Sequence, residues 1–584
     1  MKILLGYGSC GIASGADNVL KAFAKVLEGT DITVERVGCN GLCFAEPVCE
    51  VITDNGESLL YGRLDYGSGK MLAEGLVNGT LMQENRLSED ELHFLNGQTR
   101  IVLSGCGRVD PESIDSYINA GGYNALKKAL EMGADGVIEE IKKSGLRGRG
   151  GAGFPTYIKW QSARNSQSDE KYVVCNADEG DPGAFMDRAV LEGDPHRVLE
   201  GMMIAGVAVG AQTGIIYVRA EYPLAVKRLQ KAIEEMRERN ILGKNIFGSG
   251  FDFDFYIMMG AGAFVCGEET ALLASLGGNR GMPVTKPPFP AQRGFRKQPT
   301  NINNVETFAN VSWIIENGGE GFAAMGTEGS KGTKVFALAG KVKRGGLVEV
   351  PMGLTIRDIV FGICGGIKDD LSVKAVQMGG PSGGCIPADM LDTVIDYENI
   401  AGTGAIMGSG GMIVMDENTC MVDMAKFFMD FTSKESCGKC VPCRIGTTRM
   451  LEILKRICDG DGEEGDIEAL VELGESIKTG ALCGLGNSAP NPVLTTIKYF
   501  RNEYESHIIN KECPAKKCTS LISFEIVADR CKCCSLCSKR CPVNAISGQI
   551  KMPYVIDGER CIRCSQCLDN CKFGAIIKKS GGDN

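Results

Sequence analysis

The sequence lacks a long hydrophobic run, an export signal and an excess of positive charge. Its best apolar stretch, residues 202–211, is far shorter than the roughly 20 residues that span a bilayer. The apolar core of its start, MKILLGYGSC, is too short for a signal peptide and shows no cleavage-like site. The net charge of −10 provides no electrostatic footprint for nucleic acid. We therefore expect a cytoplasmic protein with neither a membrane span nor a nucleic-acid partner.

Cysteine, by contrast, is abundant. The chain has 26 cysteines in 584 residues, and 16 of them lie between residues 437 and 571. In a protein without an export signal, such thiols are ligands or buried side chains rather than disulfides. Because many thiols of this last set are separated by only two residues, we predict that they ligate metal.

The chain is long enough for roughly three to five domains. Alternating strand-like and helix-like segments predict a multidomain α/β protein. Residues 1–95 form a small α/β unit, residues 105–330 a larger one rich in glycine loops, and residues 331–416 a small β-grasp-like module. Residues 417–510 show the helical pattern of a bundle, and residues 520–584 are a cysteine-dense tail.

The tail contains the motif C-x2-C-x2-C-x3-C twice, 30 residues apart. Bacterial two-cluster ferredoxins use this spacing, and the fourth cysteine of each run ligates the other cluster. Two zinc knuckles are the alternative, but zinc sites rarely use this doubled run. Cys533 is a spare thiol in this scheme. The spacing predicts one [4Fe-4S] cluster on Cys531, Cys534, Cys537 and Cys571, and a second on Cys561, Cys564, Cys567 and Cys541.

A third group begins at CGKCVPC. Cys437, Cys440 and Cys443 have the same two-residue gaps, and Cys483 follows after 40 further residues. Three thiolates from one loop and one remote thiolate fit a cubane cluster. From the spacing alone, zinc remains an alternative.

The segment GLRGRGGAGFP contains a literal G-x-G-x-x-G at Gly148, Gly150 and Gly153. A dinucleotide-binding Rossmann motif needs a strand before it, whereas the preceding EEIKKS is typical of a helix. A glycine loop followed by a helix that starts with proline can still present backbone N–H groups to phosphate. Arg149 and Lys159 would add positive charge. A mobile surface loop is the plain alternative.

Acidic and amide side chains follow two other segments of this region. YVVCNADEGDPG is a strand that runs into several such groups, and in α/β folds ligands bind at the carboxyl ends of strands. GAGAFVCGEETA likewise places acidic residues at the start of a predicted helix. KPPFPAQ and TNINNVET are two further candidate ligand-binding segments. The candidate residues are Asn176, Asp178, Glu179, Asp181, Glu268 and Glu269.

Taken together, these segments resemble a known family. GLRGRGGAGFP, VCNADEGDPG, GAGAFVCGEETALLASL, KPPFPAQ, INNVET and ESCGKCVPCR are similar to the flavin-bearing, NADH-oxidising subunit of respiratory complex I, over roughly residues 105–505. With its tail and N-terminal module, the whole chain resembles the beta subunit of multimeric NAD-dependent [FeFe]-hydrogenases, many of which are electron-bifurcating. Related subunits serve formate dehydrogenases and transhydrogenases, and a non-catalytic electron-relay scaffold is a further alternative.

The resemblance implies a thioredoxin-like domain at residues 1–95 and a β-grasp (SLBB-like) domain at residues 331–416. It implies that FMN lies over the glycine loop and contacts Gly148, Arg149, Gly150, Lys159, Asn176, Asp178, Phe264, Glu268, Asn303 and Asn304. It places the nicotinamide of NAD(H) near Phe154, Glu179, Asp181, Glu269, Lys286 and Phe289, with Glu179 and Glu269 as catalytic groups. It assigns Cys437, Cys440, Cys443 and Cys483 to the [4Fe-4S] cluster that accepts electrons from FMN.

Two positions depart from the family pattern. The respiratory enzymes have a glutamate where this chain has Asp181, and an aromatic side chain where it has Ser162. Both departures leave the choice between NAD and NADP open.

The implied chemistry is an exchange between two-electron and one-electron carriers. NADH delivers a hydride, iron–sulfur clusters accept single electrons, and FMN can do both. Hydride transfer needs no histidine base, which is consistent with a chain of only 3 histidines. No cysteine run is left for a catalytic metal, so we expect the chain not to be the terminal hydrogen or formate catalyst. Its partners would be ferredoxin, a small thioredoxin-like [2Fe-2S] subunit and a catalytic or ferredoxin-oxidising subunit of one oligomeric complex.

The N-terminal module looks like a thioredoxin-fold [2Fe-2S] domain with a ligand missing. That pattern has two early cysteines and a late C-x3-C pair, and here only Cys10 precedes Cys39 and Cys43. Leu5 or Gly6 stands where the partner of Cys10 is expected, and Cys49 could replace it. The resemblance predicts a [2Fe-2S] cluster on Cys10, Cys39 and Cys43.

The segment HIINKECPAKKC supplies His507, Cys513 and Cys518, and Cys458 is available from the bundle. Nitrogen and sulfur ligands of this kind suit a tetrahedral structural zinc. Surface thiols beside a histidine at a helix end are the alternative. The thiols that occur singly in apolar or glycine-rich segments, Cys420 among them, are expected to be inert and buried.

Overall fold

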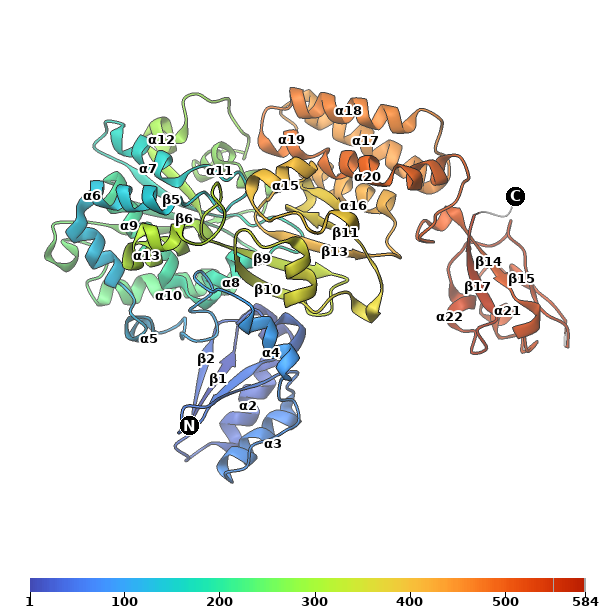
Figure 1. Ribbon diagram of the computed structural model, residues 1–584, viewed down its shortest axis with the longest axis horizontal. Coiled ribbons are helices and arrows are strands. Elements are labelled where there is room, and N and C mark those ends of the chain that lie inside the picture. Colours follow the sequence, from blue (N-terminus) through green and yellow to red (C-terminus); the bar gives the residue numbers. More distant parts are fainter. Residues whose placement is uncertain (550, 582–584) are drawn as a thin grey trace. The chain divides into compact units, whose positions relative to one another are not determined.

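The computed structural model describes residues 1–549 and 551–581 (Figure 1). The chain divides into two compact units. The first unit consists of Met1–Asp370, Val376–Gly380 and Ala388–Val414, and the second of Leu371–Ala375, Pro381–Pro387 and Met415–Asn584. Among the described residues, no helix combines the length and the apolar character that crossing a membrane requires.

The first unit begins with a small four-stranded sheet of order β2-β1-β3-β4. Its strands are β1 (Lys2–Gly6), β2 (Thr33–Val37), β3 (Cys49–Ile52) and β4 (Ser58–Tyr61). β1 pairs in parallel with β2 and antiparallel with β3. The helices α1 (Ser9–Ala13), α2 (Ala16–Val26), α3 (Tyr66–Val77) and α4 (Glu89–Asn96) accompany it. Val19 and Phe23 of α2 and Leu72 of α3 are fully buried in the core of this part.

A second sheet of the same unit is entirely parallel, with the order β7-β6-β5-β8. Its strands are β5 (Tyr172–Ala177), β6 (Thr213–Arg219), β7 (Asp254–Gly260) and β8 (Thr300–Asn304). Strand β5 is buried at nearly every position, as expected for a parallel sheet that is covered on both faces. The helices around it are α5 (Ile114–Asn119), α6 (Asn124–Ser144), α7 (Thr156–Asn165), α8 (Met186–Gly193), α9 (Pro195–Val209), α10 (Pro223–Glu238), α11 (Glu269–Leu276), α12 (Pro290–Arg293), α13 (Val305–Asn317) and α14 (Gly319–Ala323).

A third sheet has the order β10-β9-β13-β11-β12. Its strands are β9 (Thr333–Gly340), β10 (Gly346–Pro351), β11 (Val373–Met378), β12 (Gly384–Pro387) and β13 (Gly411–Asp416), and α15 (Tyr397–Thr403) precedes the last of them. A buried ion pair joins β9 to α13, because Lys334 donates to the Glu306 carboxylate and Glu306 accepts from the Val335 N–H at 2.9 Å. Both charged side chains are at most 2% exposed. This pair fixes the start of β9 against the helix that follows β8.

The second unit contains a helical bundle and the cysteine-dense tail. The bundle helices are α16 (Met421–Lys434), α17 (Val441–Asp459), α18 (Asp466–Gly480), α19 (Gly484–Ser488) and α20 (Asn491–Ile508). In the tail, β14 (Ile522–Ile526) pairs with β17 (Ile576–Ser580) and β15 (Ile546–Ser547) with β16 (Val555–Ile556), both antiparallel. Two short helices, α21 (Leu536–Arg540) and α22 (Gln566–Asp569), begin at equivalent positions of the two cysteine runs, two residues after the second cysteine of each run.

A buried polar network links α5 and the start of α6 to α9. The Tyr117 hydroxyl donates to Glu200 at 2.5 Å, and the Tyr123 hydroxyl lies 2.6 Å from Nδ1 of His196. The ring of His196 is fully buried and stacks on Tyr117 with 5.4 Å between ring centroids. Burial disfavours the charged imidazolium and lowers the pKa of His196 to about 3.

This pKa predicts an acid-dependent loss of stability. Above the ordinary histidine pKa of about 6.5, both folded and unfolded states hold a neutral ring, so His196 adds no pH dependence. Below it the unfolded chain takes up a proton that the folded chain does not bind, which lowers the free energy of unfolding by roughly 2.5 kcal/mol between about pH 7 and about pH 4.5. His196→Asn should remove this component, whereas His93→Asn at an exposed position should keep it.

The acid dependence is measured by urea unfolding followed through tryptophan fluorescence. The signal reports on the unit that contains His196, because both tryptophans, Trp160 and Trp313, lie in the first unit. An equally steep acid dependence in His196→Asn and the unsubstituted chain would contradict the assignment.

Candidate functional site

The glycine loop between α6 and α7 folds back on itself. The Gly148 N–H donates to the Phe154 carbonyl at 2.9 Å, and a Cβ added at Gly153 would lie 2.6 Å from the Tyr397 ring. Gly150 is exposed, and a Cβ there would lie 3.0 Å from the Cβ of Asn304 at the end of β8. The loop therefore lies against the carboxyl end of the parallel sheet, where bare backbone can approach a ligand.

The Arg149 side chain is held by main-chain carbonyls of the protein. Its side chain is fully buried, and the guanidinium donates to the main-chain carbonyls of Thr333, Arg147 and Lys331 at 3.0, 3.0 and 2.6 Å. The Arg149 N–H donates to the Thr307 hydroxyl at 2.9 Å. The guanidinium thus uses its planar set of N–H donors to hold the glycine loop in place.

Amide side chains meet at the ends of β5 and β8, because parallel pairing sets Asn176 opposite Asn304. Asn176 donates to the Gly267 carbonyl at 2.9 Å and accepts from the N–H of Asp178, which is 8% exposed, at 3.1 Å. The turn before α11 is thereby fastened to the end of β5.

The two asparagines that end β8 have separate partners. Asn303 accepts from the Trp160 indole N–H at 2.9 Å and is buried. Asn304 caps α13 by accepting from the Glu306 N–H at 2.9 Å, and its amide donates to Asp187 at 2.5 Å. Sequence reasoning missed Asp187, because its position inside the short helix α8 gives no signal of a contact with β8.

Two lysines enclose Glu269 at the start of α11. Lys159 donates to the Ile302 carbonyl at 2.8 Å and lies 3.1 Å from a Glu269 carboxylate oxygen. Lys286 lies 2.8 Å from Glu269 and 3.2 Å from Glu268, which caps α11 by accepting from two of its N–H groups at 2.9 Å. Burial acts to raise the pKa of Glu269, but the two lysine charges outweigh it and hold that pKa below its ordinary value. Glu269 is therefore an ionised carboxylate between two cations.

Glu179 and Asp181 lie in the loop after β5. Glu179 is 5% exposed and accepts from the N–H groups of Asp187 and Arg188 at 3.0 and 3.2 Å, so it binds the start of α8. Burial raises the pKa of Glu179. Asp181 accepts from the Ser409 hydroxyl at 2.6 Å, and burial raises the pKa of Asp181 to about 6.

Aromatic rings complete the region. Phe154 and Phe289 are 49% and 52% exposed, which leaves two flat apolar faces available for stacking. Phe264 is half-buried and packs on the loop after β5, since a Cβ at Gly180 would lie 2.6 Å from its ring. Through these contacts the structure brings the glycine loop, the ends of β5 and β8 and the start of α11 into one region.

In the second unit, the thiols of CGKCVPC and Cys483 lie at helix starts. Cys440 directly precedes α17, Cys443 lies in its first turn, and Cys483 directly precedes α19. Cys443 is buried and lies 3.2 Å from the Ser436 hydroxyl. Burial raises the pKa of Cys443, and interaction with the thiols of Cys440, Cys483 and Cys437 raises it further. Cys443 thus lies within electrostatic reach of the other three thiols.

The tail brings its cysteines together in two sets. A cavity of about 340 Å³ is lined by Cys531, Cys534, Cys537 and Cys571, and a smaller hollow by Cys541, Cys561, Cys564 and Cys567. Each set combines three thiols of one run with the last thiol of the other, which is the grouping that the spacing predicts.

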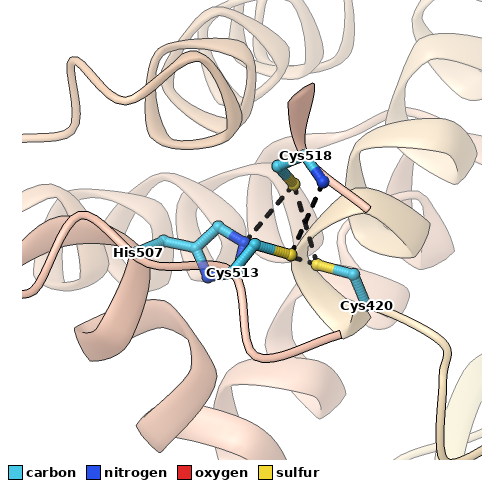
Figure 2. Close-up of side chains that lie close together, drawn as sticks. All are labelled: Cys420, His507, Cys513 and Cys518. Carbon is cyan, nitrogen blue, oxygen red and sulfur yellow. Dashed lines mark hydrogen bonds between the residues drawn. The ribbon is translucent and has the colours of Figure 1, made fainter. Parts of the chain in front are cut away.

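A buried group of four ligand-type side chains lies beside α16 and α20 (Figure 2). The ligand atoms of Cys420, His507, Cys513 and Cys518 all lie within 4.8 Å of one another. Nε2 of His507 is 3.4 Å from the sulfurs of Cys420 and Cys518, while Nδ1 donates to the Glu503 carbonyl at 2.7 Å. That bond leaves the Nε2 lone pair facing the thiols, as in zinc-ligating histidines.

The fourth member of this group differs from the one expected. Cys420 lies beside His507 and Cys518, whereas Cys458 lies with Cys518 and Asp423 in a second group. Cys420 was expected to be an inert buried thiol. No signal in its local sequence indicates the contact, because it lies 87 residues from His507 and becomes a neighbour only when α16 packs against α20.

In the N-terminal part, the thiol of Cys43 interacts with the thiols of both Cys10 and Cys39. Cys49 does not join them in the described structure. It lies in β3 with 1% exposure and packs among the apolar side chains of that core.

Two family models match the chain. The Nuo51 FMN-binding domain matches residues 141–313, and the NADH-ubiquinone oxidoreductase-F iron–sulfur binding region matches residues 423–507. The first range contains the glycine loop and the ends of β5 and β8, and the second contains the thiols around α17 and α19.

Relatives and a solved structure cover most of the chain. The NADP-reducing hydrogenase subunit HndC of Solidesulfovibrio fructosivorans is 58% identical over 82% of this chain and 98% of its own length. The second F-type subunit of the NADH-quinone oxidoreductase of Rhizobium meliloti is 44% identical over 71% of this chain and 99% of its own. A crystal structure of NAD+-reducing [NiFe]-hydrogenase in the H2-reduced state covers 87% of this chain and 84% of that one, at 29% identity and a TM-score of 0.63. The chain therefore belongs to the family of FMN-binding, iron–sulfur-containing oxidoreductase subunits that includes HndC and the F-type subunits of the NADH-quinone oxidoreductases.

Proposed function

We propose that the chain is the subunit of an oligomeric oxidoreductase that exchanges electrons between a nicotinamide nucleotide and one-electron carriers. The observation that carries this proposal is the contact of the glycine loop with the end of β8, beside the Lys159–Glu269–Lys286 group. It joins bare backbone, two cations and an ionised carboxylate at the carboxyl edge of a parallel sheet, where α/β folds bind nucleotides. Family membership supports the same assignment.

The residues present fit FMN. Gly148 and Gly150 leave room for phosphate against the loop, and the partly exposed Lys159 supplies a nearby charge. Asn176, Asn303 and Asn304 hold the strand ends, together with Asp178, Phe264 and Glu268. When bound, FMN supplies the conversion between hydride transfer and single-electron transfer. The role of Arg149 is to position the loop through the carbonyls of its neighbours.

The nicotinamide nucleotide would bind on the open side of the same region. Phe154 and Phe289 offer exposed rings for stacking, and Lys286 offers a cation held by Glu269. Glu269 is ionised between two lysines and orients these cations. Glu179 holds the start of α8, and Asp181 fixes the loop after β5 by accepting from the Ser409 hydroxyl. HndC is named NADP-reducing, and Asp181 and Ser162 are the positions at which we place the choice between NAD and NADP.

The thiol sets of the second unit would carry single electrons onward. Cys437, Cys440, Cys443 and Cys483 fit one [4Fe-4S] cluster, because three approach from one loop and the start of α17 favours their anionic form. The two sets of the tail fit two further [4Fe-4S] clusters. The N-terminal thiols Cys10, Cys39 and Cys43 fit a [2Fe-2S] group.

The acceptor is proposed to be ferredoxin or a hydrogenase-type catalytic subunit, with electron bifurcation as one mode of use. A formate dehydrogenase or transhydrogenase partner is the alternative within the same class. A non-catalytic electron-relay scaffold is the alternative of another class, and it predicts a chain that binds no flavin and oxidises no NADH.

Replacing Cys440 with serine separates the two halves of the proposed path. The first unit is untouched, so NADH should still reduce the flavin at close to the normal rate. Electron passage to ferredoxin should fall at least roughly tenfold, a rise of about 1.4 kcal/mol in barrier, because a cubane ligand is lost. Cys533→Ser, at a thiol outside the three sets, is the control and should keep both activities and its iron. Normal iron content and normal ferredoxin reduction in Cys440→Ser would show that this site does not carry the electrons.

The buried group of Figure 2 is proposed to hold a structural zinc ion. Three thiolates and an imidazole form a closed tetrahedral set, which leaves no position for a substrate. Elemental analysis of purified protein should find zinc in the unsubstituted chain and in Cys458→Ala, and a loss of most of it in Cys420→Ala. Loss of zinc in Cys458→Ala with full retention in Cys420→Ala would instead support the ligand set expected from the sequence.

A further inference from the structure

The carboxylate of Glu46 lies among the N-terminal thiols. One of its oxygens accepts from the Cys39 thiol at 3.1 Å, and the other accepts from the Val48 N–H at 3.2 Å. Cys39 is 6% exposed, and its thiol in turn interacts with that of Cys43. Three thiols and one carboxylate therefore share a single small region between β1, α1 and the loop after β2.

Glu46 also fills the space of the missing cysteine. A Cβ added at Gly6, at the end of β1, would lie 3.7 and 4.0 Å from the two Glu46 oxygens. A Cβ at Gly11, in α1 beside Cys10, would lie 3.2 Å from one of them. A side chain at position 6 would thus project to the place that the carboxylate now occupies. The Glu46 carboxylate therefore takes the position that the side chain of an early cysteine would occupy.

We propose that Glu46 is the fourth protein ligand, beside Cys10, Cys39 and Cys43, of a [2Fe-2S] group. This inference rests on the proposal that these cysteines hold an iron–sulfur group, and it specifies how the set is completed. A carboxylate brings the same charge as a thiolate, and mixed sulfur and oxygen or nitrogen ligation of a [2Fe-2S] iron has precedent in sites where two histidines replace two cysteines. Cys49, the thiol expected to substitute, is held in the core of β3.

The charges around the set agree with an anionic group. The Arg188 guanidinium donates to the Cys10 sulfur at 3.5 Å. The Glu46 carboxylate is partly buried, and a carboxylate held away from water needs a positive centre or hydrogen-bond donors beside it. Bound iron would supply that centre.

The proposed group lies against α8. Ser9, which begins α1, donates through its N–H and hydroxyl to Glu192 of α8 at 2.8 and 2.6 Å. Arg188 of the same helix contacts Cys10 through its side chain and Glu179 through its N–H. One short helix thus connects the N-terminal thiols with the loop that follows β5.

The test compares full-length variants after anaerobic reconstitution with iron and sulfide and reduction by dithionite. EPR is recorded at a temperature at which [4Fe-4S] signals are broadened by fast relaxation, so the one-electron-reduced [2Fe-2S] signal is seen alone. The unsubstituted chain should show it, and Glu46→Gln should lose it together with about two irons per chain. Glutamine keeps the side-chain shape and an acceptor for the Val48 N–H, so the fold should be retained.

A reciprocal variant and two controls make the result specific. Gly6→Cys combined with Glu46→Gln should regain the signal at a lower reduction potential, because a thiolate donates more electron density to iron than a carboxylate does. Glu50→Gln and Cys49→Ala should keep the unsubstituted spectrum. A Glu46→Gln spectrum identical to that of the unsubstituted chain would overturn the proposal, as would zinc in place of iron at the N-terminal site.

If Glu46→Gln does not fold, the EPR spectrum of the unsubstituted chain tests the ligand set instead. A spectrum typical of four thiolate ligands would overturn the proposal. Dithionite reduces the group without flavin, so these outcomes do not depend on NADH oxidation. Flavin reduction by NADH, measured on the same samples, reports separately on the proposed function.

Discussion

Parallel pairing of β5 with β8 is the constraint on which the candidate site depends. It sets Asn176 opposite Asn304 and thereby brings together two loops that are more than a hundred residues apart in sequence. The glycine loop packs on Asn304, and Lys159 is anchored by the Ile302 carbonyl of β8. From that anchor Lys159 reaches Glu269, which also holds Lys286. The register of this pair of strands therefore places Lys159 directly, and Glu269 and Lys286 through Lys159.

The two units use different means to position their functional groups. In the first unit, main-chain groups and buried polar side chains hold the loops, as the guanidinium of Arg149 and the Glu306–Lys334 pair show. Such buried groups need complete sets of partners, because an unpaired charge away from water is costly. In the second unit the thiols lie in short loops and helix starts, and the bound metal would complete the structure. Folding and cofactor binding are then one process in the tail, which has little apolar core of its own.

The sequence predicted these features unequally. The two thiol sets of the tail follow from spacing alone, because ligands three residues apart must converge on one side of a turn. The strand pattern and the acidic and amide residues after YVVCN predicted a candidate site at a strand end, whereas the parallel pairing of β5 with β8 became known only from the structure. Cys420, Asp187 and Glu46 could not be found in this way, since each becomes a neighbour only through packing of distant elements or through a residue type outside the expected motif. The sequence likewise shows the charge of Arg149, but not the carbonyls of Thr333 and Lys331 to which its guanidinium donates.

The central claim is that the region around Glu269 passes reducing equivalents from a nicotinamide nucleotide to bound flavin. Stopped-flow mixing of NADH with the FMN-loaded, iron-replete chain tests it most directly, with flavin absorbance as the signal. The account predicts rapid flavin bleaching in the unsubstituted chain. It predicts bleaching slowed by roughly tenfold in Glu269→Gln with flavin still bound, since Lys159 and Lys286 lose their shared anion. Glu328→Gln, at an exposed position of the same unit, should bleach normally. A chain that binds no flavin, or whose flavin is reduced equally fast with and without the Glu269 carboxylate, would contradict the account.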